Sequence, residues 1–392
     1  MNVKYIHTGW LIDGTGQDIQ KDRVLTILNH TLVSIDPVNQ DLIKKITLDL
    51  SRHTILPPLI DAHVHLSMSG TLDLNRRQSQ LKMDFHDAQQ LIVHHLNTYH
   101  ASGISDVRDG GDHCGHTHRF KQTKKHCVQI HSPGVGWHRE GRYGSFVGKG
   151  IPENEKCLHH IKTFQDIDHI KIILSGMNSL KTFGKQTPEQ FSRKDMSAIC
   201  QWAYKNNTPV MVHANGEHPV HIAIESGCSS IEHGYFMGSE NLKKMADQQI
   251  FWTPTLIPMY TLSEYLDNPT EKDIALRTFD DQCKQLINAK TLGVPVVCGS
   301  DAGSYGVDHG KSLFDELQLF VRCGYSLPQA IQSCTSLSNK LLRSKLSGTL
   351  QKGEPARFIA IEASPDNFVE TRSHLHPLFQ MFDEYYDDYQ VA

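Results

Sequence analysis

The chain has 392 residues, of which 39% are hydrophobic and 21% are charged, a composition typical of a folded globular protein. Its 39 basic and 43 acidic residues give a net charge of −4, which argues against nucleic acid or an anionic membrane as the main partner. Nine cysteines without a CxxC pair predict reduced thiols and a cytoplasmic protein, and neither a signal peptide nor a membrane span is expected.

Residues 1–56 form the first predicted unit, which is built from short strands. A turn signal at 13–16 (DGTG) precedes strand-like stretches at 24–28 and 47–50. The pattern indicates a small β unit without long helices.

From residue 59 onward, short apolar strands alternate with amphipathic helices. We predict strands at 59–65, 104–107, 127–130, 169–174, 209–213, 229–233, 250–255 and 295–300, and helices at 84–101, 188–206, 239–248 and 270–292. This alternation is typical of parallel βα units, and eight strands predict an α/β fold, a (β/α)8 TIM barrel over residues 57–347. A doubly wound open sheet is the alternative, but no GxGxxG motif follows the first strand.

The end of the chain is predicted to return to the first unit. A helix pair at 326–343 is followed by turns and by a strand at 358–361, so residues 348–392 would complete the β unit begun by residues 1–56. Phe379, Phe382, Tyr385, Tyr386 and Tyr389 of the acidic tail have the spacing of one helix face. That face would pack on the body of the protein or on a second subunit of a homo-oligomer.

Several predicted strands end in side chains that bind metals. His63 and His65 are one residue apart and therefore point to the same side of their strand. Further along, Lys171 lies inside an apolar strand, and other strands close on His213, His233 and Asp301. Each of these residues has an ordinary structural explanation by itself. Together, at the strand ends that form the active face of a barrel, they suit zinc or a similar divalent ion.

The contexts of these residues resemble the amidohydrolase superfamily, in particular its imidazolonepropionase-like and prolidase-like branch. The similar motifs are GISDVRD at 103–109, IEHG at 231–234 and GSDAG at 299–303, together with the His-x-His strand. The resemblance extends from about residue 5 to about residue 365. It implies a barrel flanked by a small β-sandwich domain built from both chain ends.

The resemblance also implies a centre of two divalent metals, taken as zinc. His63, His65 and Asp301 would hold one ion, His213 and His233 the other, and Lys171 would bridge them as a carbamate made with carbon dioxide. Burial of Lys171 among isoleucines favours the neutral amine that carbon dioxide attacks. Asn215 stands where many relatives have a second histidine, which leaves the metal ligands intact but weakens any transfer of substrate.

The expected activity is hydrolysis of a C–N amide bond of a small-molecule substrate. A hydroxide bridging the two metals would attack the carbonyl, and Asp301 would shuttle the proton to the leaving amine. Lactone or organophosphate hydrolysis and ring deamination remain alternatives on the same metals. A barrel that binds without catalysis is a further alternative.

The loop at 136–146 is predicted to recognise the substrate. Arg139 and Arg142 could grip a carboxylate, Tyr143 could add a hydrogen bond, and His138 could donate to the carbonyl oxygen as a catalytic group. His309, in a second loop at 305–310, could face the same pocket. These residues predict an N-acyl amino acid or a dipeptide as substrate, although each arginine alone could be a solvated surface charge.

Overall fold

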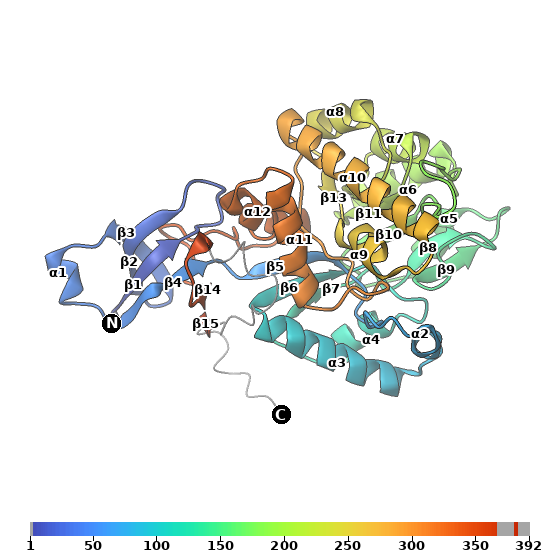
Figure 1. The fold of residues 1–392 in the computed structure, drawn as a ribbon. Helices are drawn as coiled ribbons and strands as arrows, with labels where there is room; N and C mark the ends of the chain where they lie inside the picture. Colours follow the sequence, from blue (N-terminus) through green and yellow to red (C-terminus); the bar gives the residue numbers. More distant parts are fainter. Residues whose placement is uncertain (1–2, 367–379, 383–392) are drawn as a thin grey trace.

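Strands from both ends of the chain meet in one six-stranded sheet. The computed structural model describes residues 3–366 and 380–382. The strands lie in the order β15-β14-β4-β1-β2-β3, at one side of the molecule in Figure 1. Their bounds are β1 (Val3–Leu11), β2 (Gln20–Leu28), β3 (Thr31–Pro37), β4 (Leu48–Leu56), β14 (Phe358–Ile361) and β15 (Gln380–Phe382), with α1 (Gln40–Ile43) before β4.

This sheet has an apolar core of its own, which includes Leu11, Leu25, Ile55 and Phe358. The antiparallel pairing of β14 with β4 confirms that the strand predicted at 358–361 rejoins the first unit. A two-layered sandwich stays a prediction. Within the predicted tail helix, residues 380–382 instead form strand β15, because their backbone pairs with β14. The other tail residues lie outside the described part of the chain.

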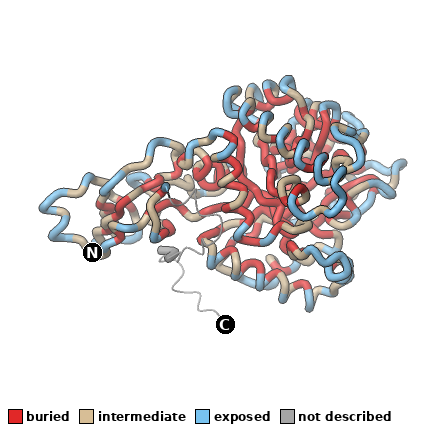
Figure 2. Tube along the Cα trace, viewed as in Figure 1, coloured by how far each residue is buried: buried red, intermediate tan, exposed pale blue. Residues whose placement is uncertain are grey.

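The central part of the chain has a TIM-barrel-type α/β fold made of parallel strands. One sheet has the order β5-β6-β7 and the other β13-β12-β11-β10-β8-β9. The buried stretches gather along these strands in Figure 2. The strands are β5 (Leu59–Val64), β6 (Ile104–Asp109), β7 (Gln129–His131), β8 (Gly136–Arg139), β9 (Gly148–Ile151), β10 (Ile170–Ile173), β11 (Val210–Ala214), β12 (Ser230–His233) and β13 (Phe251–Thr253).

The chain segment 295–302 lies between β13 and β5. Trp252 of β13 donates its N–H to the carbonyl of Pro295 at 3.0 Å, and Ala62 of β5 donates to Cys298 at 3.1 Å. Single parallel bridges also join Trp252 to Val296 and Val64 to Ala302. The eighth strand predicted at 295–300 thus occupies a strand position without forming a regular strand.

The helices follow the strands in sequence, as predicted. The four predicted at 84–101, 188–206, 239–248 and 270–292 are confirmed as α3, α6, α8 and α10, with α6 starting later because Ser192 caps it by accepting the N–H of Asp195. The helices of this part of the chain are α2 (Leu74–Gln80), α3 (Phe85–Ala101), α4 (His116–Thr123), α5 (Cys157–Ile161), α6 (Arg193–Lys205), α7 (Glu217–Glu225), α8 (Ser239–Gln248), α9 (Ile257–Tyr265), α10 (Pro269–Leu292), α11 (Lys311–Arg322), α12 (Leu327–Ser333) and α13 (Ser336–Leu342).

The loop predicted at 136–146 begins as a buried strand, β8, and not as a loop. Gly136 pairs with Lys171 of β10, and a side chain at position 136 would come within 2.8 Å of Ile173. Glycine therefore marks a close approach between strands here and not a flexible loop. Among the described helices, none combines the length and the apolar character needed to cross a membrane.

Candidate metal centre

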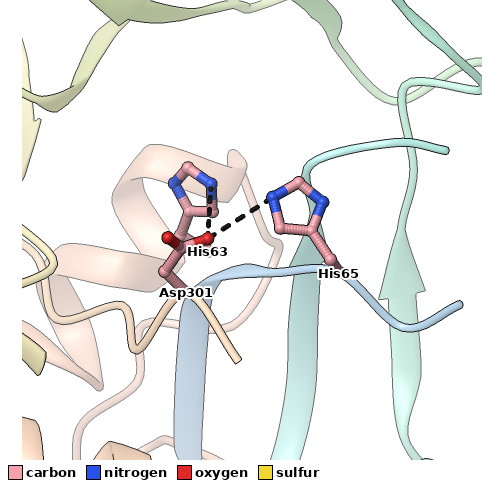
Figure 3. A group of neighbouring side chains, drawn as sticks. All are labelled: His63, His65 and Asp301. Carbon is pink, nitrogen blue, oxygen red and sulfur yellow. Dashed lines mark ion pairs between the residues drawn. The ribbon is translucent and has the colours of Figure 1, made fainter. Parts of the chain in front are cut away.

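His63, His65 and Asp301 form a compact group at the carboxyl ends of two neighbouring strand positions (Figure 3). The N–H of Asp301 donates to the carbonyl of His63 at 2.8 Å, which joins the two segments side by side. Oδ1 of Asp301 lies 3.6 Å from Nε2 of His63 and 3.4 Å from Nε2 of His65. All three side chains are buried, and one ligand atom from each lies within 4.8 Å of the other two.

The other ring nitrogen of each histidine is held by the protein. Nδ1 of His63 lies 2.8 Å from Oε2 of Glu232, and Nδ1 of His65 lies 3.2 Å from the carbonyl of Gly111. Both partners are acceptors, so each Nδ1 carries the proton and each Nε2 presents a lone pair toward Asp301. The sequence-predicted orientation of the two rings to one side is thus found in the structure.

The fit of this group to a metal can be tested on the buried atoms themselves. Burial, together with the charge of Lys171, lowers the pKa of His63 to about 4, so its ring is neutral at pH 7. Its Nε2 is buried and has no hydrogen-bond partner, and it faces a carboxylate oxygen that is also an acceptor. Two buried acceptors facing each other are unfavourable unless a cation lies between them, so the donor set fits a divalent metal.

His213 and His233 lie around this group near the ends of β11 and β12, and Lys171 lies inside β10. The His233 ring centroid is 5.0 Å from that of His63 and 4.6 Å from that of His213. Nδ1 of His233 lies 2.6 Å from Oγ1 of Thr255, which leaves its Nε2 available. Among the described residues, only His63, His65 and Asp301 approach closely enough to form a ligand group, so the second site stays a prediction.

Two of these residues have a backbone conformation that only a few residues adopt. His233 has φ 66° and Asp301 has φ 57°, both in the left-handed region. Such a conformation costs of order 1 kcal/mol or more for a residue with a Cβ, and it aims the side chain where a regular strand would not. The sharp turn at the strand end therefore presents each side chain to the centre of the active face.

Lys171 is buried in the middle of the apolar strand β10. Burial lowers its pKa to about 8, although the charges of Glu232 and Asp301 oppose this shift. Roughly one tenth of the amine is consequently neutral at pH 7, far more than for an exposed lysine, and the carbamate prediction requires this neutral form.

A buried ion pair behind His63 was missed by the sequence analysis. Nη1 of Arg108 lies 3.1 Å from Oε1 of Glu232, and its Nη2 donates to Oγ of Ser230 at 2.8 Å. Burial would raise the pKa of Glu232, but Arg108 and the hydrogen bond from His63 hold it well below its ordinary value. The carboxylate therefore stays charged and fixes the tautomer of His63. The sequence did carry a signal for this pair, because Arg108 and Glu232 are charged residues inside two of the apolar strand motifs.

Asp61 fixes the position of the segment that carries Asp301. Its Oδ1 accepts the N–H of Ser300 at 2.9 Å, and its Oδ2 accepts the Ser300 hydroxyl at 2.6 Å. Burial raises the pKa of Asp61 to about 7 in spite of these bonds. This carboxyl also was not singled out from the sequence.

Tyr143 lies beside the predicted metal ligand His213, and His138 lies in strand β8. The Tyr143 ring is 5.4 Å from the His213 ring, and its backbone carbonyl is held by Nε2 of Gln190 at 2.8 Å. Nδ1 of His138 lies 2.8 Å from the carbonyl of Arg139, so the neutral ring donates there and its Nε2 is an acceptor. His138 would consequently donate to a substrate oxygen only as an imidazolium. Arg142 is exposed, and its guanidinium approaches the carbonyl of Pro188 at 3.4 Å.

The structure does not favour the predicted role of Arg139 in binding substrate. Its guanidinium is buried, donates to the carbonyls of Pro152 and Glu155, and lies 3.2 Å from Oδ2 of Asp195. It also stacks on Phe191, with 4.9 Å to the ring centroid. These contacts use the guanidinium to join β8 to α6, and they leave little capacity for a ligand.

His309 also makes its contacts within the protein. Its Nε2 lies 2.7 Å from the carbonyl of Met68 and its Nδ1 lies 3.0 Å from the Tyr99 hydroxyl. Its ring also stacks on His95 at 3.8 Å between centroids. Both nitrogens are occupied within the protein, which does not favour the predicted role of His309 as a substrate ligand.

Comparison with known proteins places these strand-end residues in a family context. The family model of the amidohydrolase family matches residues 54–384. Ochratoxinase of Aspergillus niger is 28% identical over 243 residues, which are 60% of this chain and 49% of that protein, so the chain spans about half the length of this relative. An uncharacterized protein of Mycobacterium tuberculosis is 23% identical over 287 residues, 71% of each chain.

Solved structures give the same answer for the fold. A Xaa-Pro dipeptidase structure has a TM-score of 0.77 with 25% identity, covering 94% of this chain and 96% of the other. The A. niger ochratoxinase structure has a TM-score of 0.75 with 18% identity, covering 94% and 91%. The family match covers most of the chain, and it confirms the resemblance carried by the strand-end motifs. The chain belongs to the amidohydrolase family.

Proposed function

We propose that this protein is a metal-dependent hydrolase that cleaves the C–N amide bond of an N-acyl amino acid or a dipeptide. The observation that carries the proposal is the buried group of His63, His65 and Asp301, in which a neutral imidazole nitrogen without a partner faces a carboxylate. The match to the amidohydrolase family and the likeness to a Xaa-Pro dipeptidase support an amide as the bond that is cleaved.

The proposed centre holds two divalent metals, taken as zinc. His63, His65 and Asp301 would hold one, His213 and His233 the other, and the Lys171 carbamate would bind both. The bound metals supply Lewis-acid polarisation of the substrate carbonyl and a water that ionises near neutral pH. Glu232 keeps Nε2 of His63 unprotonated by accepting the Nδ1 proton, so the protein holds this ligand ready at neutral pH.

Asp301 is the proposed proton carrier. The Ser304 hydroxyl donates to its Oδ2 at 2.9 Å, which orients the carboxylate and leaves Oδ1 toward the two histidines. Burial would raise the pKa of Asp301, but its contacts with the surrounding histidines hold it far below its ordinary value. The ionised carboxylate accepts the proton of the attacking water and passes it to the leaving amine nitrogen.

Substrate recognition is assigned to Arg142, Tyr143 and His138. Arg142 is the predicted arginine whose guanidinium remains exposed, so it is available to pair with a free carboxylate. Tyr143 lies next to His213 and offers a hydroxyl to the substrate. Arg139 is no longer included, because its donors are used within the protein.

The proposed architecture around the centre is a closed eight-stranded barrel over residues 57–347, flanked by a β-sandwich from residues 1–56 and 348–392. The backbone hydrogen bonds from the segment 295–302 to both β13 and β5 support closure. The shared sheet of β4 and β14 supports the joining of both chain ends. Closure brings Asp301 beside His63, as the proposed ligand set requires.

Two measurements on purified protein test the proposal together. Elemental analysis after reconstitution with zinc and bicarbonate should give close to two divalent ions per chain. A panel of N-acyl amino acids, dipeptides, lactones and phosphotriesters should then show amide hydrolysis that a chelator abolishes. A preference for a lactone or a phosphotriester would refute the substrate assignment, and protein that retains no metal would refute the mechanism.

A further inference from the structure

Two loops at the active face carry ligands of the metal group and are joined to each other. His65 begins the loop after β5, and Asp301 begins the loop that leads to α11. The N–H of Gly306 donates to the carbonyl of Gly70 at 2.9 Å, and His309 contacts the carbonyl of Met68 at 2.7 Å. The relative position of the two loops therefore depends on contacts between the loops as well as on strand pairing.

Arg77 of α2 contacts both loops with one guanidinium. Its Nη1 donates to the carbonyl of Ser69 at 2.8 Å and its Nη2 donates to the carbonyl of Gly303 at 3.0 Å. Within residues 3–366 and 380–382, no carboxylate forms an ion pair with it. Partial burial lowers the pKa of Arg77, while the negative charge of Asp301 acts in the opposite direction. The Arg77 guanidinium therefore donates its side-chain hydrogen bonds to two backbone carbonyls near the metal group.

The second loop also packs tightly against His65, the residue of the metal group that belongs to the first loop. A side-chain carbon at Gly303, where φ is +95°, would come within 2.5 Å of the His65 carbonyl oxygen and 2.9 Å of the Met68 carbonyl. Gly303 is two residues beyond Asp301. A displacement of Gly303 therefore acts directly on the backbone of His65, and little space exists to absorb it.

Helix α2 holds the first loop at a second point. Oε1 of Gln80 accepts the N–H of Ser69 at 3.1 Å, and Nε2 of Gln80 donates to the Ser69 hydroxyl at 2.7 Å. Ser69 is consequently fixed to α2 by three hydrogen bonds, while Arg77 donates the one hydrogen bond found between α2 and Gly303 in the described part of the chain. Arg77 is the group through which α2 sets the position of the second loop.

We propose that Arg77 is a positioning residue, which holds the two loops at the separation that lets His65 and Asp301 share one metal ion. A planar guanidinium satisfies two carbonyls in fixed directions, and charge-assisted hydrogen bonds are stronger than neutral ones. A lysine ammonium carries the same charge but has no rigid fork. The inference rests on the proposed metal centre, which it extends by naming the residue that sets its geometry.

The test measures zinc affinity of the full-length, metal-stripped protein by competition with a chromophoric zinc chelator. We expect Arg77→Met to raise the zinc Kd of the tightest site at least tenfold, which corresponds to about 1.4 kcal/mol. The zinc Kd of Arg77→Lys should remain closer to that of Arg77→Met than to that of the original protein. Arg76→Met is the matched control, because Arg76 is the exposed neighbour on the same helix, and its zinc Kd should not change.

A rescue experiment separates positioning from general destabilisation. Guanidinium ion at millimolar concentration should restore part of the zinc affinity of Arg77→Ala but none of that of Arg76→Ala. Far-UV circular dichroism and the unfolding midpoint of each metal-free variant establish that it is folded. If Arg77→Met does not fold, the comparison of Arg77→Lys with Arg76→Lys replaces it.

The outcomes distinguish this inference from the proposed function. An unchanged zinc Kd in a folded Arg77→Met, or full restoration of affinity by Arg77→Lys, would overturn the positioning role while the metal centre stands. Absence of zinc binding by the unaltered protein would overturn the proposed function and this inference with it.

Discussion

The buried pair of Glu232 and Arg108 gives the sharpest test of how the centre is supported. Glu232→Gln keeps the size of the side chain and an oxygen that can accept the Nδ1 proton of His63, but it removes the negative charge. Arg108, 2% exposed in its side chain, then has no anion within reach in the described network, which contains only Ser230 as a further partner. The variant isolates the charge from the shape of the side chain.

The magnitude follows from the burial of both partners. Removal of one member of a buried ion pair costs about 3–5 kcal/mol of stability, because the remaining charge stays buried without compensation. Loss of the carboxylate behind a metal-binding histidine reduces metal affinity by about 10- to 100-fold. We therefore expect Glu232→Gln to lower the unfolding free energy of the metal-free protein by about 3–5 kcal/mol and to weaken zinc binding by about 10-fold or more.

Urea unfolding of metal-free protein and competition with a zinc chelator measure the two effects separately. Adding Arg108→Met to Glu232→Gln removes the uncompensated guanidinium, so it should restore most of the stability but not the zinc affinity. Glu240→Gln is the matched control, because Glu240 is exposed and pairs with Lys243 at the surface, and such pairs contribute about 0–1 kcal/mol. The reasoning is refuted if Glu232→Gln and Glu240→Gln have the same stability and the same zinc affinity.

Further predictions concern the metal ligands and the substrate loop. Lys171→Ala should lose bound metal and activity together, with partial recovery in short carboxylic acids; normal metal content and rate would show that Lys171 is only a strand residue. Because the Lys171 pKa is lowered to about 8, reactivation of metal-stripped protein by zinc at a fixed concentration of dissolved carbon dioxide should accelerate as pH rises toward 8 and level off above it, and a rate independent of pH under that condition would contradict the carbamate. Asp301→Asn should greatly reduce kcat with the fold preserved, and an effect on KM alone would argue against proton transfer. Arg142→Met should raise KM for a substrate with a free carboxylate at least tenfold, about 1.4 kcal/mol, with metal content unchanged, whereas Arg139→Met should lower the unfolding midpoint; equal stability of the two variants would contradict the structural role of Arg139.

Properties that depend on neighbours in the chain could be predicted from the sequence. The alternation of apolar strands with amphipathic helices predicted the barrel-type fold, and the matched helices differ from their predictions mainly at capped ends such as Ser192. The spacing of His63 and His65 fixes their common direction, because side chains alternate along a strand. The strand-end motifs identified the family for the same local reason.

Contacts between distant segments could not be predicted in this way. Arg139 looks like a free cation in a polar loop, but the strand β8 directs its guanidinium toward Asp195 on α6, 56 residues away. His309 has a side chain of the kind found in binding sites. Its two ring nitrogens contact Met68 and Tyr99 because its loop packs against these residues. A side chain of either kind can bind substrate or the protein itself, and the choice depends on which backbone comes near it.

The sequence by itself therefore determined the strand and helix order, the direction of the paired histidines and the family of the protein, because these follow from local periodicity and short motifs. The tertiary structure alone decided that Arg108 meets Glu232 across 124 residues and that Arg77 reaches both Ser69 and Gly303. Hydrogen bonds act over about 3 Å, and no pattern along the chain states which distant groups the fold brings within that distance.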